Sequence, residues 1–332
     1  MLSLPLVDGP LVYVMICVVL TLVFQWWYRS RKLDIRYEDT YVLITGCDTG
    51  FGNGAAVKFD QLGFNVFAGC YSAEKMEELS SKCSPKLCPF HLDVSSDASV
   101  NKALEIVTEK LPPNTGIWAV VNNAGLMGTV GPVEWLEKKH YKQTLSVNLL
   151  GMMAVTKAFL PLVRVSHGRV VLVSSVLGRF PITPAPYAVS KSCVEAWGNR
   201  LRLELWDQDV SVHLIEPGGY RTNLTDATLL VKSLEKSYQE LNDDLKIFYG
   251  EKYTKKLYDL MTLTRNGVWG KNLEEVVDAY VHAVTSHHPK ARYVVGLNGN
   301  LLFRPMWMLP TRLADFLVGM SLPQPAGFGQ AS

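Results

Sequence analysis

Tyr187 and Lys191 are the two residues whose types and spacing most directly suggest chemistry. They stand four positions apart, so on a helix they would share one face. A lysine ammonium beside a phenol stabilises the phenolate and lowers its pKa from about 10 towards the range of an acid/base catalyst. This spacing alone is common in unrelated proteins, where both residues have structural roles. Its interpretation therefore depends on the rest of the chain.

A glycine-rich turn follows the apolar run 41–45. Glycine permits a tight turn and lets the backbone approach a pyrophosphate, which then rests on the N-terminus of the next helix. The turn therefore predicts a dinucleotide-binding loop. Its expected members are Thr45, Gly46, Asp48, Thr49, Gly50, Phe51 and Gly52.

Further polar residues stand where other apolar runs end. Asn122 and Asn123 come after the run 118–121, and Ser175 comes after 169–174. In an open parallel sheet, ligands bind beside the carboxyl ends of the strands. We therefore expect these residues at the same edge as the glycine turn. Three other segments are expected on that side: Asn148, in the helical stretch before the fifth run, Ala124-Gly125, and Pro217-Gly218.

Short apolar runs alternate with helical patterns along most of the chain. The runs lack polar alternation, as expected for strands that are buried on both faces. The sequence therefore predicts an α/β fold, a doubly wound parallel sheet (Rossmann fold) with helices on both faces. The expected strands are 41–45, 65–69, 89–92, 118–121, 169–174, 211–215 and 292–296, and the expected helices are 52–62, 73–82, 97–110, 138–165 and 186–207.

The pattern changes after the sixth run. Residues 224–285 are helical in pattern and rich in charge and tyrosine, which indicates an insertion that covers a ligand crevice. The apolar stretch 300–322 is interrupted by charged residues and prolines, so a helix on a membrane surface or against the core is favoured over a second span. The predicted division is 1–32 as membrane anchor and basic flank, 33–299 as catalytic domain, and 300–332 as apolar tail.

The motifs occur in an order that resembles the short-chain dehydrogenase/reductase family. They are TGCDTGFG, LDV, NNAG, SVN, VSS, YAVSK and EPGGYRT, spread over about residues 38 to 225. The resemblance implies an alcohol dehydrogenase in which Tyr187 donates or accepts the proton and Ser175 hydrogen-bonds the substrate oxygen. It also implies that Lys191 binds the nicotinamide ribose and lowers the tyrosine pKa, and that Asn148 holds a water of the proton relay.

The resemblance extends to the cofactor. It implies that Asp93 and Val94 border the adenine, Asn123 the ribose side and Thr222 the carboxamide. Together with the glycine turn, the implied cofactor-binding set also contains Ala124, Gly125, Tyr187, Lys191, Pro217 and Gly218. Asp48 would repel a 2′-phosphate, so NAD is favoured over NADP. The usual acidic partner of the ribose is missing at the end of the second strand, where Glu74 is nearest, and Lys75 leaves NADP open.

Motifs such as TGCDxGFGN, LPLV and EPGGYRTNL are similar to the retinol and hydroxysteroid dehydrogenase branch of the family. The expected substrate is therefore an apolar alcohol, a steroid or a retinoid. The segment between Ser175 and Tyr187 is proline-rich where retinol enzymes tend to be glycine-rich, which leaves the substrate open. Two alternatives remain: a 3-hydroxybutyrate-type dehydrogenase and a non-catalytic dinucleotide-binding sensor.

Leu11 to Tyr28 forms an apolar run of 18 residues, about the minimum for a transmembrane helix. Aromatic residues close the run, and Arg29, Arg31 and Lys32 follow it, as at a cytoplasmic membrane boundary. A cleaved signal peptide would begin with basic residues and end with small ones, and a core helix would lie inside the catalytic domain. We therefore expect an anchor in the endoplasmic reticulum membrane, with the catalytic domain in the cytoplasm.

The net charge of +2 gives no reason to expect a nucleic-acid partner. The six cysteines lack metal-binding spacing, so no metal is expected. His282, His287 and His288 show no ligand pattern and are expected to be solvated. The remaining candidate partner is a second copy of the chain, in a homodimer.

Overall fold

A parallel sheet of seven strands forms the centre of the protein. The computed structural model describes residues 9–182, 185–267 and 269–327, and the strand order is β3-β2-β1-β4-β5-β6-β7. The predicted doubly wound sheet is therefore confirmed, with the order reversing between β1 and β4. The strands are β1 (Tyr41–Thr45), β2 (Asn65–Cys70), β3 (Leu87–His91), β4 (Ala119–Asn122), β5 (Arg169–Val173), β6 (Ser211–Pro217) and β7 (Arg292–Val295).

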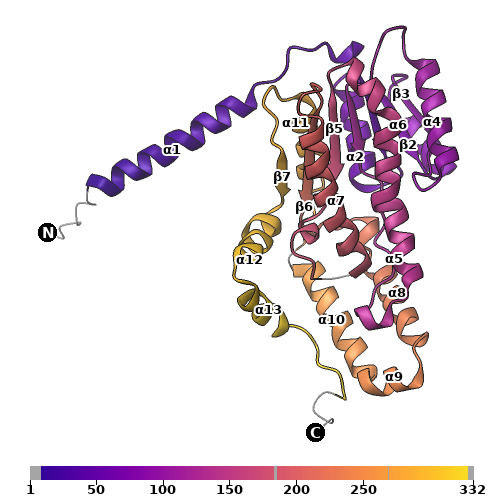
Figure 1. Ribbon diagram of the computed structural model, residues 1–332, viewed down its shortest axis with the longest axis vertical. Coiled ribbons are helices and arrows are strands. Elements are labelled where there is room, and N and C mark those ends of the chain that lie inside the picture. The colour runs from indigo at the N-terminus through magenta and orange to yellow at the C-terminus, as the bar shows by residue number, and fades with distance from the viewer. Residues whose placement is uncertain (1–8, 183–184, 268, 328–332) are drawn as a thin grey trace.

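Helices cover both faces of the sheet and extend beyond its carboxyl edge (Figure 1). The first part of the chain contributes α1 (Gly9–Ser30), α2 (Gly50–Gln61), α3 (Ala73–Lys82), α4 (Asp97–Lys110), α5 (Lys138–Leu145), α6 (Met152–Val165) and α7 (Ala185–Glu204). The second part contributes α8 (Ala227–Gln239), α9 (Asp243–Tyr249), α10 (Glu251–Gly267), α11 (Glu274–Thr285), α12 (Arg304–Met308) and α13 (Thr311–Gly319).

The strands β1 to β6 send side chains into two separate cores, because successive residues of a strand point to opposite faces, and β7 contributes to one of them. On β1, Val42 and Ile44 join a core with α2, α3 and α11, whereas Leu43 joins the core under α4, α6 and α7. Both cores are fully desolvated at their centres, where Phe59 of α2 and Phe159 of α6 have no exposed surface. Burial of one such side chain stabilises the fold by about 2–3 kcal/mol. The sheet is therefore a rigid platform for whatever its carboxyl edge holds.

The helical stretch predicted over 138–165 contains an irregular turn. Helix α5 passes into a π-helical turn, Ser146–Gly151, before α6 begins. Asn148 lies in this turn and is fully buried. Turns of this kind are frequent at functional sites, because the extra residue redirects a side chain. The apolar periodicity of the sequence continues unchanged through this turn, so the sequence did not predict the turn.

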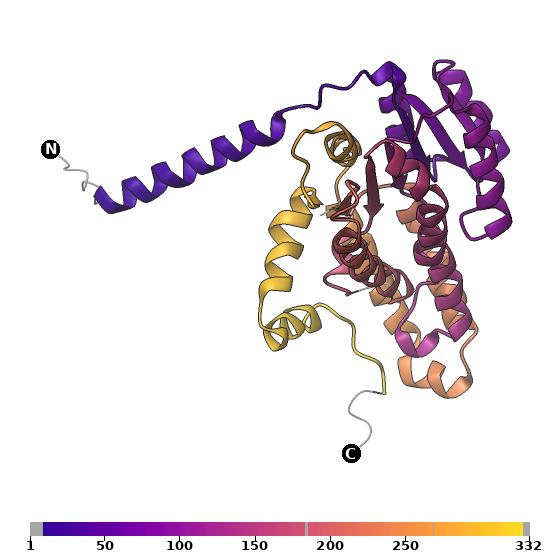
Figure 2. The same cartoon turned by 45° about the horizontal axis from the view of Figure 1, so that its top comes forward.

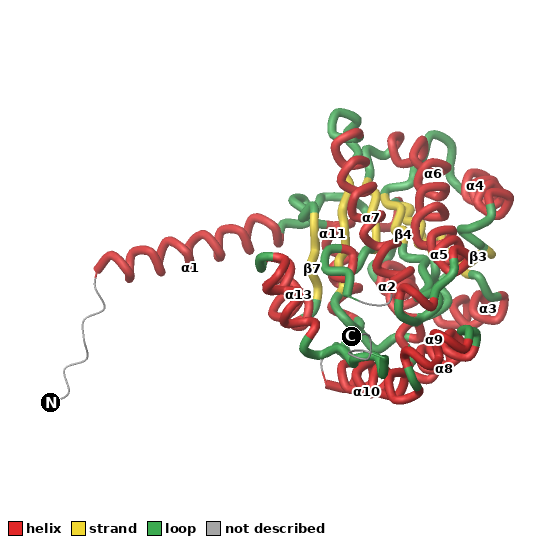
Figure 3. The backbone as a smooth tube through the Cα atoms, turned by 60° about the horizontal axis from the view of Figure 1, so that its bottom comes forward, coloured by secondary structure: helices red, strands yellow, loops and turns green. Residues whose placement is uncertain are grey.

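The predicted insertion, 224–285, divides into two structural parts. Helices α8, α9 and α10 extend beyond the carboxyl edge of the sheet, where Figures 1 and 3 show them grouped together. Their apolar side chains meet the loop after β4 in a third core around Trp135, Leu234 and Tyr249. Helix α11 instead packs on α2 and on the strands β5, β6 and β7. The part that stands apart from the sheet thus comprises α8–α10, and α11 belongs to the helix layer.

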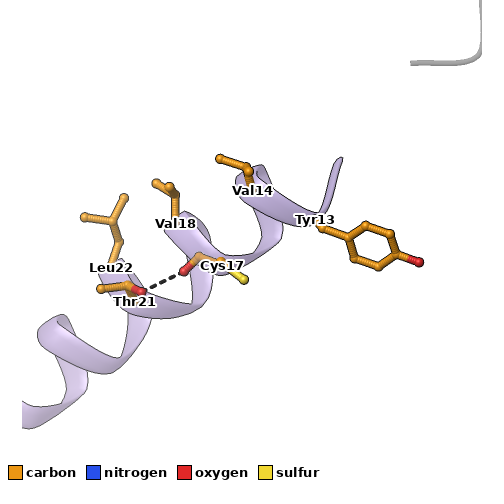
Figure 4. A pocket seen from close by; sticks show the side chains of 6 residues that line it. All are labelled: Tyr13, Val14, Cys17, Val18, Thr21 and Leu22. Carbon is orange, nitrogen blue, oxygen red and sulfur yellow. Dashed lines mark hydrogen bonds between the residues drawn. The ribbon is translucent and has the colours of Figure 1, made fainter. Parts of the chain in front are cut away.

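Helix α1 projects alone from the body (Figures 1 and 2). Its window Val12–Ser30 has a mean hydropathy of 1.5, and none of it is buried in the molecule. Figure 4 shows side chains along it, with the hydroxyl of Thr21 directed at the carbonyl oxygen of Cys17, to which it donates a 2.7 Å hydrogen bond. The polar group of Thr21 is therefore satisfied within the helix, as an apolar surrounding requires.

A second stretch of similar hydropathy, Lys138–Val165, is a core helix instead of a span. It covers α5, the π-turn and α6, and 39% of its window is buried. Phe159 and Val163 of α6 have no exposed surface and lie in the core beside α4. Of the two long apolar helical stretches among the described residues, α1 is therefore the one that is not buried in the protein.

Candidate active site

The glycine turn after β1 forms a cradle closed by the segment that follows β4. Asn123 Nδ2 donates to the carbonyl oxygens of Thr45 and Gly46 at 2.9 and 3.0 Å. The hydroxyl oxygen of Thr45 accepts from the backbone N–H groups of Asn123 and Ala124, at 3.1 and 3.0 Å. The two segments, about eighty residues apart in the chain, thus fix each other's backbone.

This cradle has no room for side chains. A Cβ on Gly52 would lie 2.2 Å from the carbonyl oxygen of Gly46, and Gly46 itself has a φ of +71°. Thr49 is the N-cap residue of α2, so the backbone N–H groups of the first turn, Gly50–Gly52, have no partners inside the helix. Such a helix start beside a close backbone is the arrangement that binds a pyrophosphate. The predicted loop residues are therefore brought together, and they fit a dinucleotide.

Four polar side chains meet beside the cradle. Tyr187, Ser175, Asn148 and Lys191 are all at least nine-tenths buried. The Nζ atom of Lys191 lies 5.7 Å from the centre of the Tyr187 ring.

Ser175 and Lys191 are each fixed by the backbone. Ser175 stands two residues after β5, and its hydroxyl oxygen accepts a 3.1 Å hydrogen bond from the N–H of Leu177. Lys191 donates a 2.7 Å hydrogen bond to the carbonyl oxygen of Val173, at the end of the same strand. The amino group on α7 is therefore held against the end of β5.

Asn148 is held from both sides. Its Oδ1 accepts from the N–H of Leu126 at 2.8 Å, and its Nδ2 donates to the carbonyl oxygen of Leu126 and to Ser190 Oγ, both at 2.9 Å. Ser190 in turn donates to the carbonyl oxygen of Tyr187 at 2.7 Å. A Cβ placed on Gly125 would lie 3.3 Å from Asn148 Oδ1 and 3.7 Å from Lys191 Nζ. The π-turn, the segment after β4 and α7 therefore converge at one point.

Burial changes the acidity of the two titratable groups. It raises the pKa of Tyr187 to about 12, an effect that a hydrogen bond with Ser175 partly offsets. Burial also lowers the pKa of Lys191 to about 8, with the charge of Glu195 opposing the shift. Each group, taken alone, favours its neutral form, because an unpaired charge is costly in a medium of low dielectric constant. A phenolate of Tyr187 and an ammonium of Lys191 would stabilise each other.

The adenine end of the predicted site lies at the ends of β2 and β3. Asp48 extends from the glycine turn to the end of β2, where its carboxylate accepts from the N–H groups of Tyr71 and Ser72. The carboxylate of Asp93 accepts a hydrogen bond from the backbone N–H of Ser95, within the loop after β3. Val94 is buried, and its carbonyl oxygen lies against Gly151 of the π-turn.

The nicotinamide end is bordered by the segment after β6. Pro217 ends that strand, and a Cβ on Gly218 would lie 1.8 Å from Asn298 Oδ1. Thr222 lies on the far side of the glycine turn, since a Cβ on Gly50 would be 3.8 Å from its side chain. The predicted residues of these separate segments thus lie at or beside the carboxyl edge of the sheet.

Sequence comparison assigns this arrangement to a family. The short chain dehydrogenase family profile matches residues 40–230. Retinol dehydrogenase 7 of Rattus norvegicus is 40% identical over 299 residues, which cover 90% of this chain and 94% of that protein. The chain belongs to the short-chain dehydrogenase family. It is therefore an enzyme that acts on an alcohol, and the predicted family membership is confirmed.

Two further comparisons agree. The 17-beta-hydroxysteroid dehydrogenase type 6 of Bos taurus is 40% identical over 302 residues, with 90% of this chain and 94% of that protein covered. A short-chain dehydrogenase from Burkholderia phymatum, solved in complex with NAD, superposes with a TM-score of 0.65 at 17% identity, covering 86% of this chain and 96% of the other. The similarity to the Burkholderia phymatum structure, at 17% identity, shows the shared fold alone.

Three residues that support the site of this dehydrogenase were not predicted from the sequence. Tyr280 of α11 is fully buried and donates a 3.0 Å hydrogen bond to Asn123 Oδ1. Asn298 donates to the carbonyl oxygen of Gly219 at 2.8 Å, and Ser190 supports Asn148 as described above. Ser190 stands directly before Lys191 in the chain, so the motif could have indicated it. Tyr280 and Asn298 lie far from any motif.

One prediction about histidines was wrong. His282 is half-buried, with Nδ1 2.8 Å from the hydroxyl of Tyr293 and Nε2 3.0 Å from the carbonyl oxygen of Arg29. His288 stacks on Tyr28, with ring centroids 3.7 Å apart, and His287 is exposed as predicted. His282 was predicted to be solvated because its partner at the end of α1 lies some 250 residues away in the chain.

Proposed function

We propose that this enzyme is an NAD-dependent dehydrogenase that oxidises an apolar alcohol, a hydroxysteroid or a retinol, beside the membrane that α1 crosses. The observation that carries the proposal is the convergence of Tyr187, Ser175, Asn148 and Lys191 at the end of a glycine cradle without room for side chains. A protein that only sensed a dinucleotide would have no use for this buried set, whose desolvation is costly.

The four side chains have separate roles in the proposed reaction. The bound nicotinamide would supply the chemistry of hydride acceptance. Ser175 hydrogen-bonds the alcohol oxygen and Tyr187 removes its proton. Lys191 keeps its ammonium form below a pH of about 8 and stabilises the resulting phenolate. Asn148 keeps the π-turn and the segment after β4 in register, and its position suits a water of the proton path.

The preference for NAD rests on Asp48. Its carboxylate lies at the end of β2, where the ribose of the adenosine would be bound, and it would repel a 2′-phosphate. Lys75, the cation that follows the end of β2 most closely in the sequence, forms an ion pair with Glu78 at 2.8 Å. A carboxylate from the glycine turn therefore takes the place of the acidic residue that the end of β2 lacks.

The substrate class is supported by the cover of the crevice and by the relatives. Helices α8–α10 contribute an apolar core around Trp135, Leu230 and Leu234. The proteins that are 40% identical over nine-tenths of this chain are named retinol dehydrogenase and 17-beta-hydroxysteroid dehydrogenase. A retinol or steroid would be bound mainly through burial of its apolar surface, which supplies the binding energy.

The membrane setting rests on α1 and on the charges after it. The helix has the length and composition of a span, and none of its window Val12–Ser30 is buried in the molecule. Arg29, Arg31 and Lys32 follow directly, and basic residues favour the cytoplasmic side. We therefore place the enzyme in the endoplasmic reticulum membrane, with the catalytic domain in the cytoplasm and the substrate supplied from the bilayer.

A substrate panel tests the proposal. Full-length enzyme in vesicles would be offered all-trans-retinol, 3α-, 11β- and 17β-hydroxysteroids and 3-hydroxybutyrate, each with NAD and with NADP, while absorbance of the reduced nicotinamide is followed. We expect turnover of a steroid or retinol with NAD. Turnover of 3-hydroxybutyrate alone, or of none of these alcohols, would contradict the proposal.

A further inference from the structure

The C-terminal helices α12 and α13 carry an apolar surface that the fold leaves uncovered. They lie along the edge of the sheet beside β7, on the side of the body from which α1 projects (Figures 1, 2 and 3). Phe303 and Ala314 are buried, whereas eight other large apolar side chains are 39–75% exposed. We call these eight the tail surface: Leu301, Leu302, Met308, Leu313, Phe316, Leu317, Met320 and Leu322.

The tail surface cannot cross a bilayer. Helix α12 has five residues and α13 has nine, whereas a span needs about 20. Pro310 separates the two helices, and Arg312 and Asp315 lie within α13. Short helices with exposed apolar side chains and interspersed charges are typical of segments that lie in the interface of a membrane.

A group of cations joins the tail surface to the end of α1. Burial lowers the pKa of Lys290, and the neighbouring charges of Arg29 and Arg304 lower it further. Arg29 lies in the last turn of α1, and Arg304 is the first residue of α12. Within residues 9–182, 185–267 and 269–327, none of the three cations forms an ion pair with a carboxylate. The ammonium of Lys290 lies 5.8 Å from the centre of the Tyr293 ring, which is a weaker partner than a carboxylate. An anionic surface would therefore relieve the mutual repulsion of the three cations.

The end of α1 is fixed to the body, which sets the height of this cation group. The carbonyl oxygen of Arg29 accepts hydrogen bonds from Ser286 Oγ at 2.8 Å and from His282 Nε2 at 3.0 Å. The ring of Tyr28 stacks on that of His288. When α1 crosses a bilayer, Lys290 and Arg304 therefore lie at the level of the lipid headgroups.

We propose that the tail surface, with Lys290 and Arg304, is a second membrane contact that lies on the anionic face of the bilayer crossed by α1. This inference rests on the proposed role of α1 as a span. Helix α12 touches the segment that leads to the catalytic tyrosine, since the guanidinium of Arg179 lies 4.5 Å from the ring centre of Trp307 in α12. Arg179 belongs to the segment between Ser175 and Tyr187. Contact of α12 with lipid would therefore bring Arg179 of this segment close to the bilayer.

Lipid crosslinking in the full-length enzyme tests this contact. Benzoylphenylalanine would replace Phe316 of α13, or Ile247 of α9 as the matched control, because both side chains are exposed, at 62% and 76%. The proteins would be reconstituted in vesicles of phosphatidylcholine with phosphatidylserine and illuminated. We expect a lipid adduct at position 316 in several-fold excess over position 247.

The outcomes separate the two membrane proposals. If no variant floats with the vesicles, the role of α1 fails. If all variants float but position 316 gives no more lipid adduct than position 247, the tail contact is wrong and α1 stands. Adducts at position 316 between two copies of the chain, in place of lipid, would overturn the proposal in favour of a protein interface.

Charge reversal tests the role of the cations. The double variant Lys290→Glu/Arg304→Glu should lower the adduct at position 316 several-fold in vesicles with phosphatidylserine, and much less in phosphatidylcholine alone. The control Lys102→Glu/Lys110→Glu changes the charge equally on α4, at the opposite side of the body (Figure 1). An equal loss for both double variants would show that net charge, and no specific contact, governs the adduct.

Discussion

The carboxylate of Asp48 accepts a 2.8 Å hydrogen bond from the backbone N–H of Ser72. This bond joins the glycine turn after β1 to the start of α3, and it places a negative charge at the end of β2. The residue thus has a structural role, as the acceptor for two backbone groups, and we propose that its charge also selects NAD over NADP.

The variant Asp48→Asn separates these two roles. The amide retains an oxygen that can accept from Tyr71 and Ser72 but removes the charge. We expect the ratio of kcat/KM with NAD to that with NADP to fall by about tenfold, which corresponds to about 1.4 kcal/mol. Steady-state kinetics with both dinucleotides measure the ratio. An unchanged ratio would mean that the charge of Asp48 does not select the cofactor.

Much of the fold could be predicted from local signals. The strand 41–45 and the helices 73–82 and 97–110 have the predicted bounds, because a glycine turn or a polar cap marks where each begins or ends. Helix α11 was predicted as part of the insertion because charged and tyrosine residues precede it. Its buried face meets α2 only in the folded chain, where Tyr280 reaches Asn123.

The predicted site residues were the ones that lie in motifs next to strand ends. Their proximity follows from the topology, since the carboxyl ends of parallel strands share an edge. The supports of these residues come from distant segments and could not be predicted in this way. The π-turn around Asn148 is an example, because a single extra residue in a helical turn leaves the apolar spacing nearly unchanged.

Tyr280→Phe should weaken cofactor binding while leaving the fold intact. The change removes the donor to the Asn123 side chain, which holds the glycine turn, and leaves a buried acceptor unsatisfied at a cost of about 1–3 kcal/mol. We expect KM for NAD to rise several-fold and kcat at saturating NAD to change less. In an Asn123→Ala background the same substitution should have little further effect. Equal effects in both backgrounds would contradict a role through Asn123.

Arg292→Leu should destabilise the protein strongly. The guanidinium pairs with Glu195 of α7 and Glu216 of β6, and both carboxylates are buried. Loss of one partner of a buried ion pair costs about 3–5 kcal/mol, because a buried charge is left uncompensated. Urea unfolding measures the loss. Arg36→Leu removes the exposed pair with Asp39 and should cost under about 1 kcal/mol, so similar losses in both variants would contradict the network's importance.

His213 should make the protein sensitive to mild acid. Burial lowers its pKa to about 4, and the hydrogen bond with the carbonyl oxygen of Lys290 opposes this shift only in part. An unfolded chain has a histidine pKa of about 6.5. From pH 6.5 down to 4 the unfolded state binds a proton that the folded state does not, so stability falls through this window by up to about 3 kcal/mol.

The variant His213→Gln tests this dependence, because glutamine can hydrogen-bond without titrating. We expect a shallower loss of unfolding free energy between pH 6.5 and 4.5 than in the wild type. His287→Gln, at an exposed position, is the control and should keep the wild-type slope. Parallel slopes for the wild type and His213→Gln would rule out His213 as the source.

We propose that Tyr187 exchanges the proton of an apolar alcohol beside a bound nicotinamide. The most direct measurement compares wild type with Tyr187→Phe in full-length enzyme, following both NAD binding and NAD-dependent oxidation of the alcohol turned over in the panel. Loss of a positioned acid/base is expected to lower kcat by about 10²–10⁴-fold, with the dissociation constant for NAD nearly unchanged. Retention of wild-type kcat by Tyr187→Phe would contradict the account.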